Sequence, residues 1–182
     1  DGEKCDIATE GDISLIFDKT VFYGEGGGQV GDTGFIMGSA AATVTDTKKT
    51  DGIFIHLARI ESGIISVGDE LTLKIDGARR SAIRRNHSSC HLLQAALRKV
   101  LGAHVEQAGS YVDEHRLRFD FSHLAPMTSE EIAKVEELVN RNILLAEACS
   151  TTVTDPQNAR KMGAMALFGE KYGTSVRVVS IG

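Results

Sequence analysis

Hydrophobic and polar residues in the first part of the chain, residues 1–78, follow the spacing of β-strands. The stretch "AAATVTDTKKTDGIFIHLARI" contains two apolar, β-branched runs joined by Asp51-Gly52, a dipeptide typical of tight hairpins. "DISLIFDKTVFY" is a third such run, and "GDELTLKID" alternates apolar with polar residues, as a strand with one buried face does. Glycine is frequent here and helix formers are sparse. We therefore predict a small β-barrel domain over residues 1–78.

After Gly77 the apolar spacing changes to that of helices. Between Ser81 and Leu101 leucine and valine recur every three or four residues, and Gly102 is a typical helix stop. "SYVDEHRLRFDFSH" then predicts a hairpin. The overall fold class is thus α+β, with an α+β domain over residues 79–182 and a boundary near 77–80.

The clearest predicted helix lies within "APMTSEEIAKVEELVNRNILLAEA". Thr128 and Glu131 form a capping-box pattern at its start. Its expected buried stripe consists of Ile132, Val135, Val139 and Ile143. Asp155-Pro156 predicts the start of a short helix, and the final "SVRVVSIG" predicts a strand.

Composition narrows the function classes. Of the 182 residues, 42% are hydrophobic and 25% charged, without an apolar run that would span a membrane. The net charge of −5 excludes an overall basic field, so contacts to RNA must be local or rest on other parts of a larger protein. The cysteines Cys5, Cys90 and Cys149 are scattered and odd in number, which favours a reducing, cytoplasmic setting; we expect Cys149 to be buried. Because the chain begins with Asp1 and ends in a strand-like run, we interpret it as a fragment of a longer protein.

Two histidines in "RRNHSSCHLLQ" are the first candidate for chemistry. His87 and His91 are four residues apart, so on a helix they stand one turn apart on the same face, away from the leucine stripe. A shared metal ion and a solvated polar face both fit this spacing. The pattern is not HExxH, which disfavours a metalloprotease. Cys90 points elsewhere, and the other histidines lack motif spacing. The further ligands that zinc requires are therefore unplaced.

The glycine-rich stretch "FYGEGGGQVGDTG" is the second candidate. It lacks the Lys-Ser/Thr of a phosphate-binding loop and is not followed by a helix, which excludes a dinucleotide fingerprint. Tight turns alone explain its glycines. They do not explain Gln29 beside Gly28, an arrangement that aims an amide and backbone N–H groups into a cleft.

Together these motifs resemble one family. "FYGEGGGQVGDTG", "RRNHSSCHLLQAALRKVLGAHVEQAGS", "LRFDFSH" and "GAMALFGEKYG", in this order along nearly the whole chain, are similar to the editing domain of alanyl-tRNA synthetases and of their free-standing AlaX-type relatives. The resemblance implies the editing fold shared by threonyl- and alanyl-tRNA synthetases. It also implies hydrolysis of serine or glycine wrongly esterified to tRNA(Ala), whose acceptor end is then the partner, with no membrane involved.

The same resemblance assigns roles to single residues. It implies zinc ligation by His87 and His91, with a cysteine and a histidine of a C-x-G-T-H motif expected beyond Gly182, so that residues 1–182 alone bind metal weakly. It places Gln107 and Ser88 in the editing pocket, with Gly28 and Gln29 facing the site. The run "ARRSAIRRNH" is expected to approach the tRNA end. Cys90 departs from the family pattern, which commonly has threonine there.

Three functions follow as alternatives. The first is the editing segment of an alanine–tRNA ligase, whose ligase region, with ATP and Mg²⁺, lies elsewhere in the protein. The second is a free-standing trans-editing deacylase, which differs in whether the gene continues on both sides of this segment. The third is a non-catalytic tRNA-binding module, against which the acidic net charge weighs.

Overall fold

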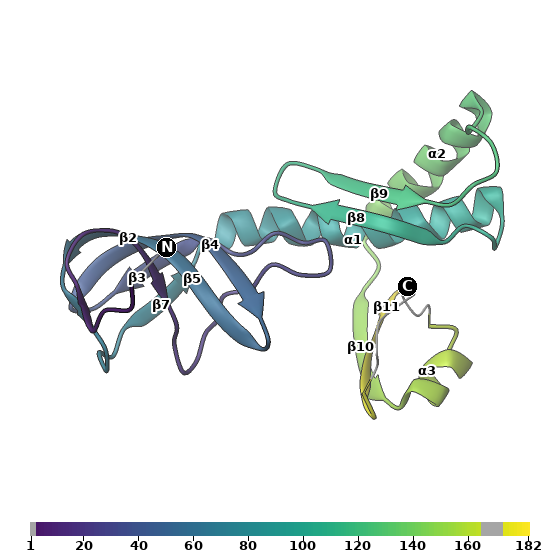
Figure 1. The fold of residues 1–182 in the computed structure, drawn as a ribbon. Coiled ribbons are helices and arrows are strands. Elements are labelled where there is room, and N and C mark those ends of the chain that lie inside the picture. Colours follow the sequence, from purple (N-terminus) through teal and green to yellow (C-terminus); the bar gives the residue numbers. More distant parts are fainter. Residues whose placement is uncertain (1–2, 165–172) are drawn as a thin grey trace. The chain divides into compact units, whose positions relative to one another are not determined.

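The computed structural model describes residues 3–164 and 173–182 (Figure 1). Contacts divide the chain into two compact units. The first contains residues 1–88 and 110–118, and the second contains residues 89–109 and 119–182. The long helix α1, Gly77–Leu101, contributes to both. The predicted domain boundary near 77–80 stays a prediction, and each unit is described below by itself.

The first unit is built on a five-stranded antiparallel sheet in the order β2-β5-β4-β3-β7. Strands β1 and β6 form a separate two-stranded antiparallel pair. The strand bounds are β1 Ile7–Ala8, β2 Gly11–Leu15, β3 Gly34–Met37, β4 Ala40–Thr50, β5 Ile53–Gly63, β6 Ile65–Ser66 and β7 Thr72–Ile75. The β-structure of this region is as predicted. Since β2 and β7 end the sheet without pairing with each other in the described chain, closure into a barrel is not confirmed.

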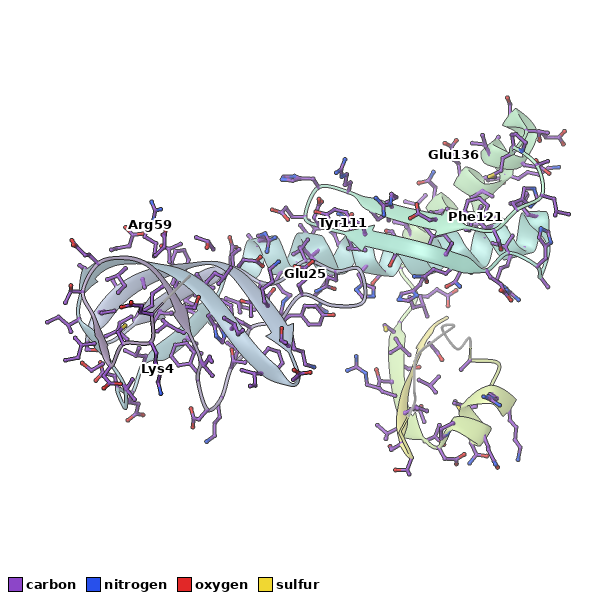
Figure 2. The ribbon with its side chains drawn as sticks, viewed as in Figure 1. Lys4, Glu25, Arg59, Tyr111, Phe121 and Glu136 are labelled. Atoms are coloured by element: carbon purple, nitrogen blue, oxygen red, sulfur yellow. The ribbon has the colours of Figure 1, made fainter. Side chains whose placement is uncertain are left out.

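The hairpin β4–β5 forms where the sequence predicts it. Asp51 and Gly52 connect the strands with φ of 51° and 83°, the left-handed values that a two-residue hairpin turn requires. Inward residues of the sheet form the core, including Ile36, Val44 and Ile60. Outward residues are exposed: Arg59 extends from the sheet surface and pairs with Asp12 (Figure 2). The predicted run "DISLIFDKTVFY" is strand only up to Leu15.

His56 lies inside this core with no exposed surface. The Leu15 carbonyl accepts a hydrogen bond from Nδ1 at 3.2 Å, and the Thr20 hydroxyl donates to Nε2 at 2.7 Å. The rings of Phe17 and Phe22 meet it edge-on, with centroids 5.1 and 5.2 Å away. Burial lowers the pKa of His56, so the neutral ring is favoured. Both nitrogens are thus engaged within the core, which removes His56 from the candidate metal ligands.

The second unit combines the C-terminal part of α1 with a second helix and with residues 107–109 and 119–121 of a hairpin, whose residues 110–118 belong to the first unit. The hairpin consists of β8, Gln107–Val112, and β9, Leu117–Phe121; α2 spans Ser129–Leu145. Phe121 of β9 belongs to the apolar cluster around Leu97, Val105 and Val135 (Figure 2). The predicted end of α1 is confirmed, since Gly102 follows its last residue with φ of 119°.

The start of α2 is confirmed and its buried stripe is corrected. The Thr128 hydroxyl accepts from the Glu131 amide at 3.2 Å, and the Glu131 carboxylate accepts from the Thr128 amide at 2.8 Å, which completes the capping box. Val135 and Val139 pack on the core as predicted, together with Leu138. Ile132 and Ile143 are 44% and 48% exposed, because the described cluster reaches only the middle of the helix.

The remaining described elements lie near the end of the chain. Strands β10, Cys149–Thr154, and β11, Val176–Ile181, pair antiparallel, and α3 spans Pro156–Lys161. Asp155 caps α3 as predicted, accepting from the amides of Gln157 and Asn158 at 2.9 and 3.0 Å. The expected burial of Cys149 is wrong: its strand is exposed along almost its whole length. Most of "GAMALFGEKYG" lies outside the described residues. Among the described helices, none is long and apolar enough to cross a membrane.

Candidate functional site

The glycine-rich segment forms a tight turn that presents Gln29. Gly26 and Gln29 exchange backbone hydrogen bonds of 3.0 and 3.1 Å across the turn. The two residues between them, Gly27 and Gly28, have φ of 58° and 80°. Both values are left-handed, so this turn requires residues that accept positive φ, which is the property of glycine.

Gly28 has a second reason to be glycine. A Cβ atom on Gly28 would lie 2.6 Å from the Ser110 carbonyl oxygen and still closer to the Ser110 hydroxyl. A Cβ atom on Gly27 would meet no atom within 4 Å. Next to this contact, the Val112 amide donates to the Gly28 carbonyl at 2.8 Å and the Val30 amide donates to the Val112 carbonyl at 3.1 Å. The turn is therefore held tightly against the end of β8.

Gln29 connects this turn to helix α1. Its side chain is buried, with 8% exposure, and its Oε1 lies 2.7 Å from Nδ1 of His87. Because an amide oxygen accepts hydrogen bonds, Nδ1 of His87 carries the proton and donates. The lone pair of the neutral ring then lies on Nε2, the nitrogen through which such a ring ligates a metal. Metal-binding histidines usually donate their other ring N–H to an acceptor of this kind.

Three further contacts anchor the start of α1. The Asp76 carboxylate accepts from the Arg79 amide at 3.0 Å. Arg80 Nε donates to Oδ1 of Asp32 at 2.7 Å, and its Nη2 pairs with Oδ2 of the same carboxylate, which is 2% exposed. Arg79 Nε donates to Glu114 at 2.9 Å. These two arginines, predicted to approach RNA, thus make structural contacts inside the first unit.

The other predicted site residues are divided between the units. Ser88 follows His87 on α1 and is exposed. His91, four residues after His87 on the same helix, belongs to the second unit and is exposed, while desolvation by neighbouring atoms lowers its pKa and favours the neutral, metal-binding form. Gln107 is the first residue of β8, half-buried in the second unit. Gly28, Gln29, His87 and Ser88 all lie in the first unit, where the side chains of Gln29 and His87 are in direct contact.

The donor set offers two imidazoles for a metal. In the described chain, no three histidine, cysteine or acidic residues gather closely enough to hold an ion. Cys90 is buried, and burial raises the pKa of its thiol, which disfavours the thiolate ligand. His104 and His123 bind each other, with Nε2 and Nδ1 2.9 Å apart. Two imidazoles alone do not complete a zinc site, which requires three or four protein ligands.

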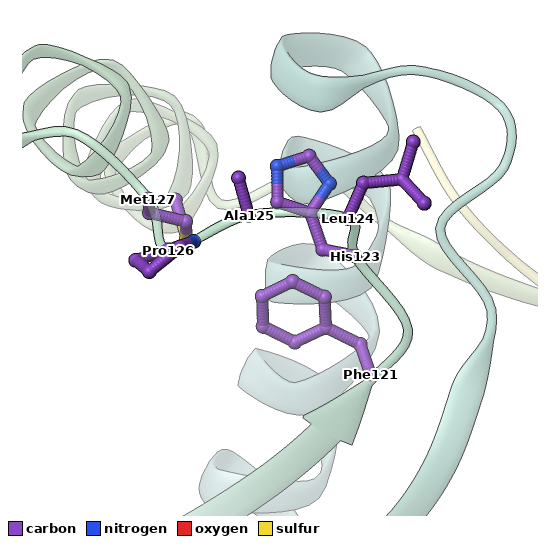
Figure 3. A pocket seen from close by; sticks show the side chains of 6 residues that line it. All are labelled: Phe121, His123, Leu124, Ala125, Pro126 and Met127. Carbon is purple, nitrogen blue, oxygen red and sulfur yellow. The ribbon is translucent and has the colours of Figure 1, made fainter.

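A cavity in the second unit does not include these residues. It has a volume of about 400 Å³ and lies beside the segment after β9 (Figure 3). Its lining consists of Phe121, His123, Leu124, Ala125, Pro126 and Met127. It contains one titratable side chain and none of the predicted site residues.

Comparison with known proteins gives the relationship of the whole chain. It is 53% identical over 184 aligned residues to the alanine–tRNA ligase of Paracoccus denitrificans, and 49% identical over 184 to that of Ruegeria sp., covering 100% of this chain in both cases. It is 53% identical to the alanine–tRNA ligase of Acetivibrio thermocellus over 99% of its length. Along its whole length the chain is similar to a segment of alanine–tRNA ligases. The family profile of class II (A) tRNA synthetases also matches residues 3–79.

The match covers a limited part of these ligases. The chain spans 21% of the length of each of the three alanine–tRNA ligases. The resemblance found in the motifs is thus confirmed as a similarity to alanine–tRNA ligases. The assignment of an editing role to this segment, and of zinc to its histidines, belongs to the proposal that follows.

The sequence analysis did not identify the two ion pairs that anchor the start of α1, Asp32 with Arg80 and Glu114 with Arg79. Asp32 and Arg80 are 48 residues apart, and Arg79 and Glu114 are 35 apart. A charged pair so distant in sequence leaves no local pattern. The dense acidic and basic residues of a 25% charged chain offer many equivalent pairings.

Proposed function

We propose that this chain is the editing segment of an alanine–tRNA ligase, and that it hydrolyses the ester bond of tRNA(Ala) wrongly charged with serine or glycine. The parent protein would attach alanine to tRNA(Ala) with ATP and Mg²⁺ elsewhere in its chain. The observation that carries the proposal is the buried Gln29 amide bound to His87 at 2.7 Å, on a helix that repeats histidine at the next turn. Relatedness to alanine–tRNA ligases along the whole chain supports it.

Such a ligase needs a second hydrolytic site for a physical reason. A pocket shaped for alanine binds the smaller glycine with a penalty of only about 1–3 kcal/mol, and it rejects the added hydroxyl of serine poorly. Errors must then be removed after charging. A separate site that selects wrong products performs this task.

The roles of the residues follow from their chemistry. His87 and His91 are the two ligands that this chain supplies for zinc. Zinc, when bound, polarises an ester carbonyl or lowers the pKa of a bound water. Gln107 and Ser88 are polar groups suited to contact the hydroxyl of serine. Gly28, which has no side chain, allows the turn to approach Ser110 closely.

The direct test is hydrolysis of Ser-tRNA(Ala) and Gly-tRNA(Ala) by residues 1–182 beside a chain extended past Gly182, each with and without zinc. We expect the extended, zinc-loaded chain to release serine fastest and Ala-tRNA(Ala) to survive. Tight, strongly salt-dependent binding of tRNA without hydrolysis by the extended chain would replace the proposal with a tRNA-binding module, for which the exposed Arg84 and Arg85 are available.

A further inference from the structure

We infer that Gln29 is a positioning residue: its buried amide fixes the ring orientation and the Nδ1–H tautomer of His87, so that Nε2 is the ligating nitrogen. The role in metal binding rests on the proposed function, whereas the tautomer assignment stands on the geometry alone. Gln29 is therefore distinct from the residues proposed to contact substrate.

The geometry suits Gln29 to this task. Its Oε1 lies 2.7 Å from the His87 ring nitrogen, and the residue is 8% exposed. A residue that reads a substrate needs an accessible polar atom. Here the amide oxygen faces the imidazole, and the residue as a whole is buried. An oxygen in this position accepts only from a protonated Nδ1, which selects one of the two neutral tautomers.

The backbone around Gln29 is built to hold that amide in place. The reciprocal Gly26–Gln29 hydrogen bonds fix the turn, and a parallel bridge joins Gln29 to Val112 of β8. The close approach of Gly28 to Ser110 sets how near the turn lies to β8. Asn86, the residue directly before His87, donates a hydrogen bond from its side-chain Nδ2 to the Asp113 carbonyl at 2.8 Å. Gln29, the acceptor, is thus anchored at Val112, and the helix turn that carries His87, the donor, is anchored at the next residue, Asp113.

The consequence for a metal ligand is specific. The amide acceptor favours one of the two neutral tautomers of the His87 ring and restrains its rotation. A ring held by such a partner is already in the ligating form, and removal of the partner typically weakens metal binding by about 10–100-fold. We expect the same order of effect here. It would be seen as a loss of zinc affinity with little change in the fold.

The experiment reads the tautomer directly, in the metal-free chain of residues 1–182 labelled with ¹⁵N-histidine. Long-range ¹H–¹⁵N NMR at mildly alkaline pH distinguishes protonated from unprotonated ring nitrogens. We expect His87 to be protonated on Nδ1. In Gln29→Ala the signal should shift towards the Nε2–H form, and in Gln29→Glu, which keeps an acceptor, the Nδ1–H form should persist. His56, whose Nδ1 faces the Leu15 carbonyl, is an internal reference that should not change.

Two results would overturn the assignment: an Nε2–H tautomer of His87 in the unmodified chain, or an unchanged Nδ1–H tautomer in Gln29→Ala. If Gln29→Ala does not fold, as loss of the His56 reference signals would reveal, Gln29→Met, similar in volume but without the acceptor, takes its place. Zinc affinity is then measured on the full-length ligase, with an expected 10–100-fold loss in the Gln29→Ala variant.

These readouts separate this inference from the proposed function. A tautomer that depends on Gln29 supports the positioning role, whatever substrate the site takes. Failure of the ligase to release serine from tRNA(Ala) counts against the proposed function and leaves the tautomer result standing.

Discussion

The histidines of the two units differ in their burial and in their hydrogen-bond partners. In the first unit, His56 and His87 each bind a partner at least 36 residues away in sequence, and the neighbouring Asp32, Thr47 and Gln29 are buried as well. In the second unit, the rings of His104 and His123 stack on each other with 5.2 Å between their centroids, and His123 also lines a cavity. A buried polar group must find a partner, because an unsatisfied one is costly. The long-range polar contacts of the first unit therefore mark an organised site, whereas an exposed pair tolerates change.

The largest expected effect tests the buried carboxylate of the first unit. Asp32→Ala removes the partner of Arg80 and the acceptor of the Tyr23 amide, which lies 2.7 Å away. Breaking a buried ion pair leaves an uncompensated charge, so we expect a loss on the order of 3 kcal/mol in the free energy of unfolding, measured by urea denaturation. The matched control is Asp12→Ala, which removes the carboxylate of an exposed Asp–Arg pair and should leave the midpoint nearly unchanged. Equal effects of the two variants would show that burial does not distinguish these pairs.

The second prediction compares two neighbouring glycines of the same turn. Both have positive φ, so an alanine at either position costs about 1 kcal/mol of backbone strain. Only Gly28 also faces Ser110, where overpacking adds about 1–3 kcal/mol. Gly28→Ala should thus lower the free energy of unfolding clearly more than Gly27→Ala in parallel denaturation curves. If Gly27→Ala is the more damaging variant, the turn does not lie against Ser110.

The third prediction concerns the second unit. Thr128→Ala removes the hydroxyl that accepts from the Glu131 amide at the start of α2, and loss of such a cap typically costs about 1 kcal/mol. Thermal unfolding followed by circular dichroism measures the change. Thr128→Ser keeps the hydroxyl and should retain most of the stability. A serine variant as unstable as the alanine variant would assign the loss to the threonine methyl group instead.

The smallest expected effect is a pH dependence that arises in the first unit. Burial lowers the pKa of His56 in the folded chain, while the unfolded chain keeps a value near 6.5. Between the two values the unfolded state binds more protons, so stability decreases as pH falls below about 6.5 and levels out below the folded-state pKa. Denaturation midpoints at several pH values should show this slope, and His56→Gln should reduce it, with the lowered pKa of His91 accounting for the remainder.

Short-range patterns predicted much of the fold. The Asp51-Gly52 hairpin, the Thr128–Glu131 capping box and the Asp155-Pro156 helix start each depend on residues at most three positions apart, and all three are confirmed. Local backbone preferences determine the geometry of these turns and caps, and these preferences are the same in any fold. The exposed Ile132 and Ile143 show the limit of periodicity: it identifies a helical face, but the extent of that face's burial depends on the length of the packing partner.

The candidate site was predictable in its residue types and not in its contacts. The histidine spacing and the glycine turn are local, and they point to His87 and Gly28. The bond between Gln29 and His87 spans 58 residues, and the Asp32–Arg80 pair spans 48. Such pairs form only when the sheet and α1 have packed. The position of Gln29 beside glycines therefore indicated a role in the site, but it did not indicate that His87 is the partner.

The most direct test of the account as a whole uses the full-length ligase in which both His87 and His91 are replaced by alanine. We predict that this variant still attaches alanine to tRNA(Ala), releases serine from Ser-tRNA(Ala) at least 100-fold more slowly than the unmodified enzyme, and accumulates Ser-tRNA(Ala) when serine is present. Unimpaired release of serine by this variant would show that the two histidines do not form the hydrolytic site.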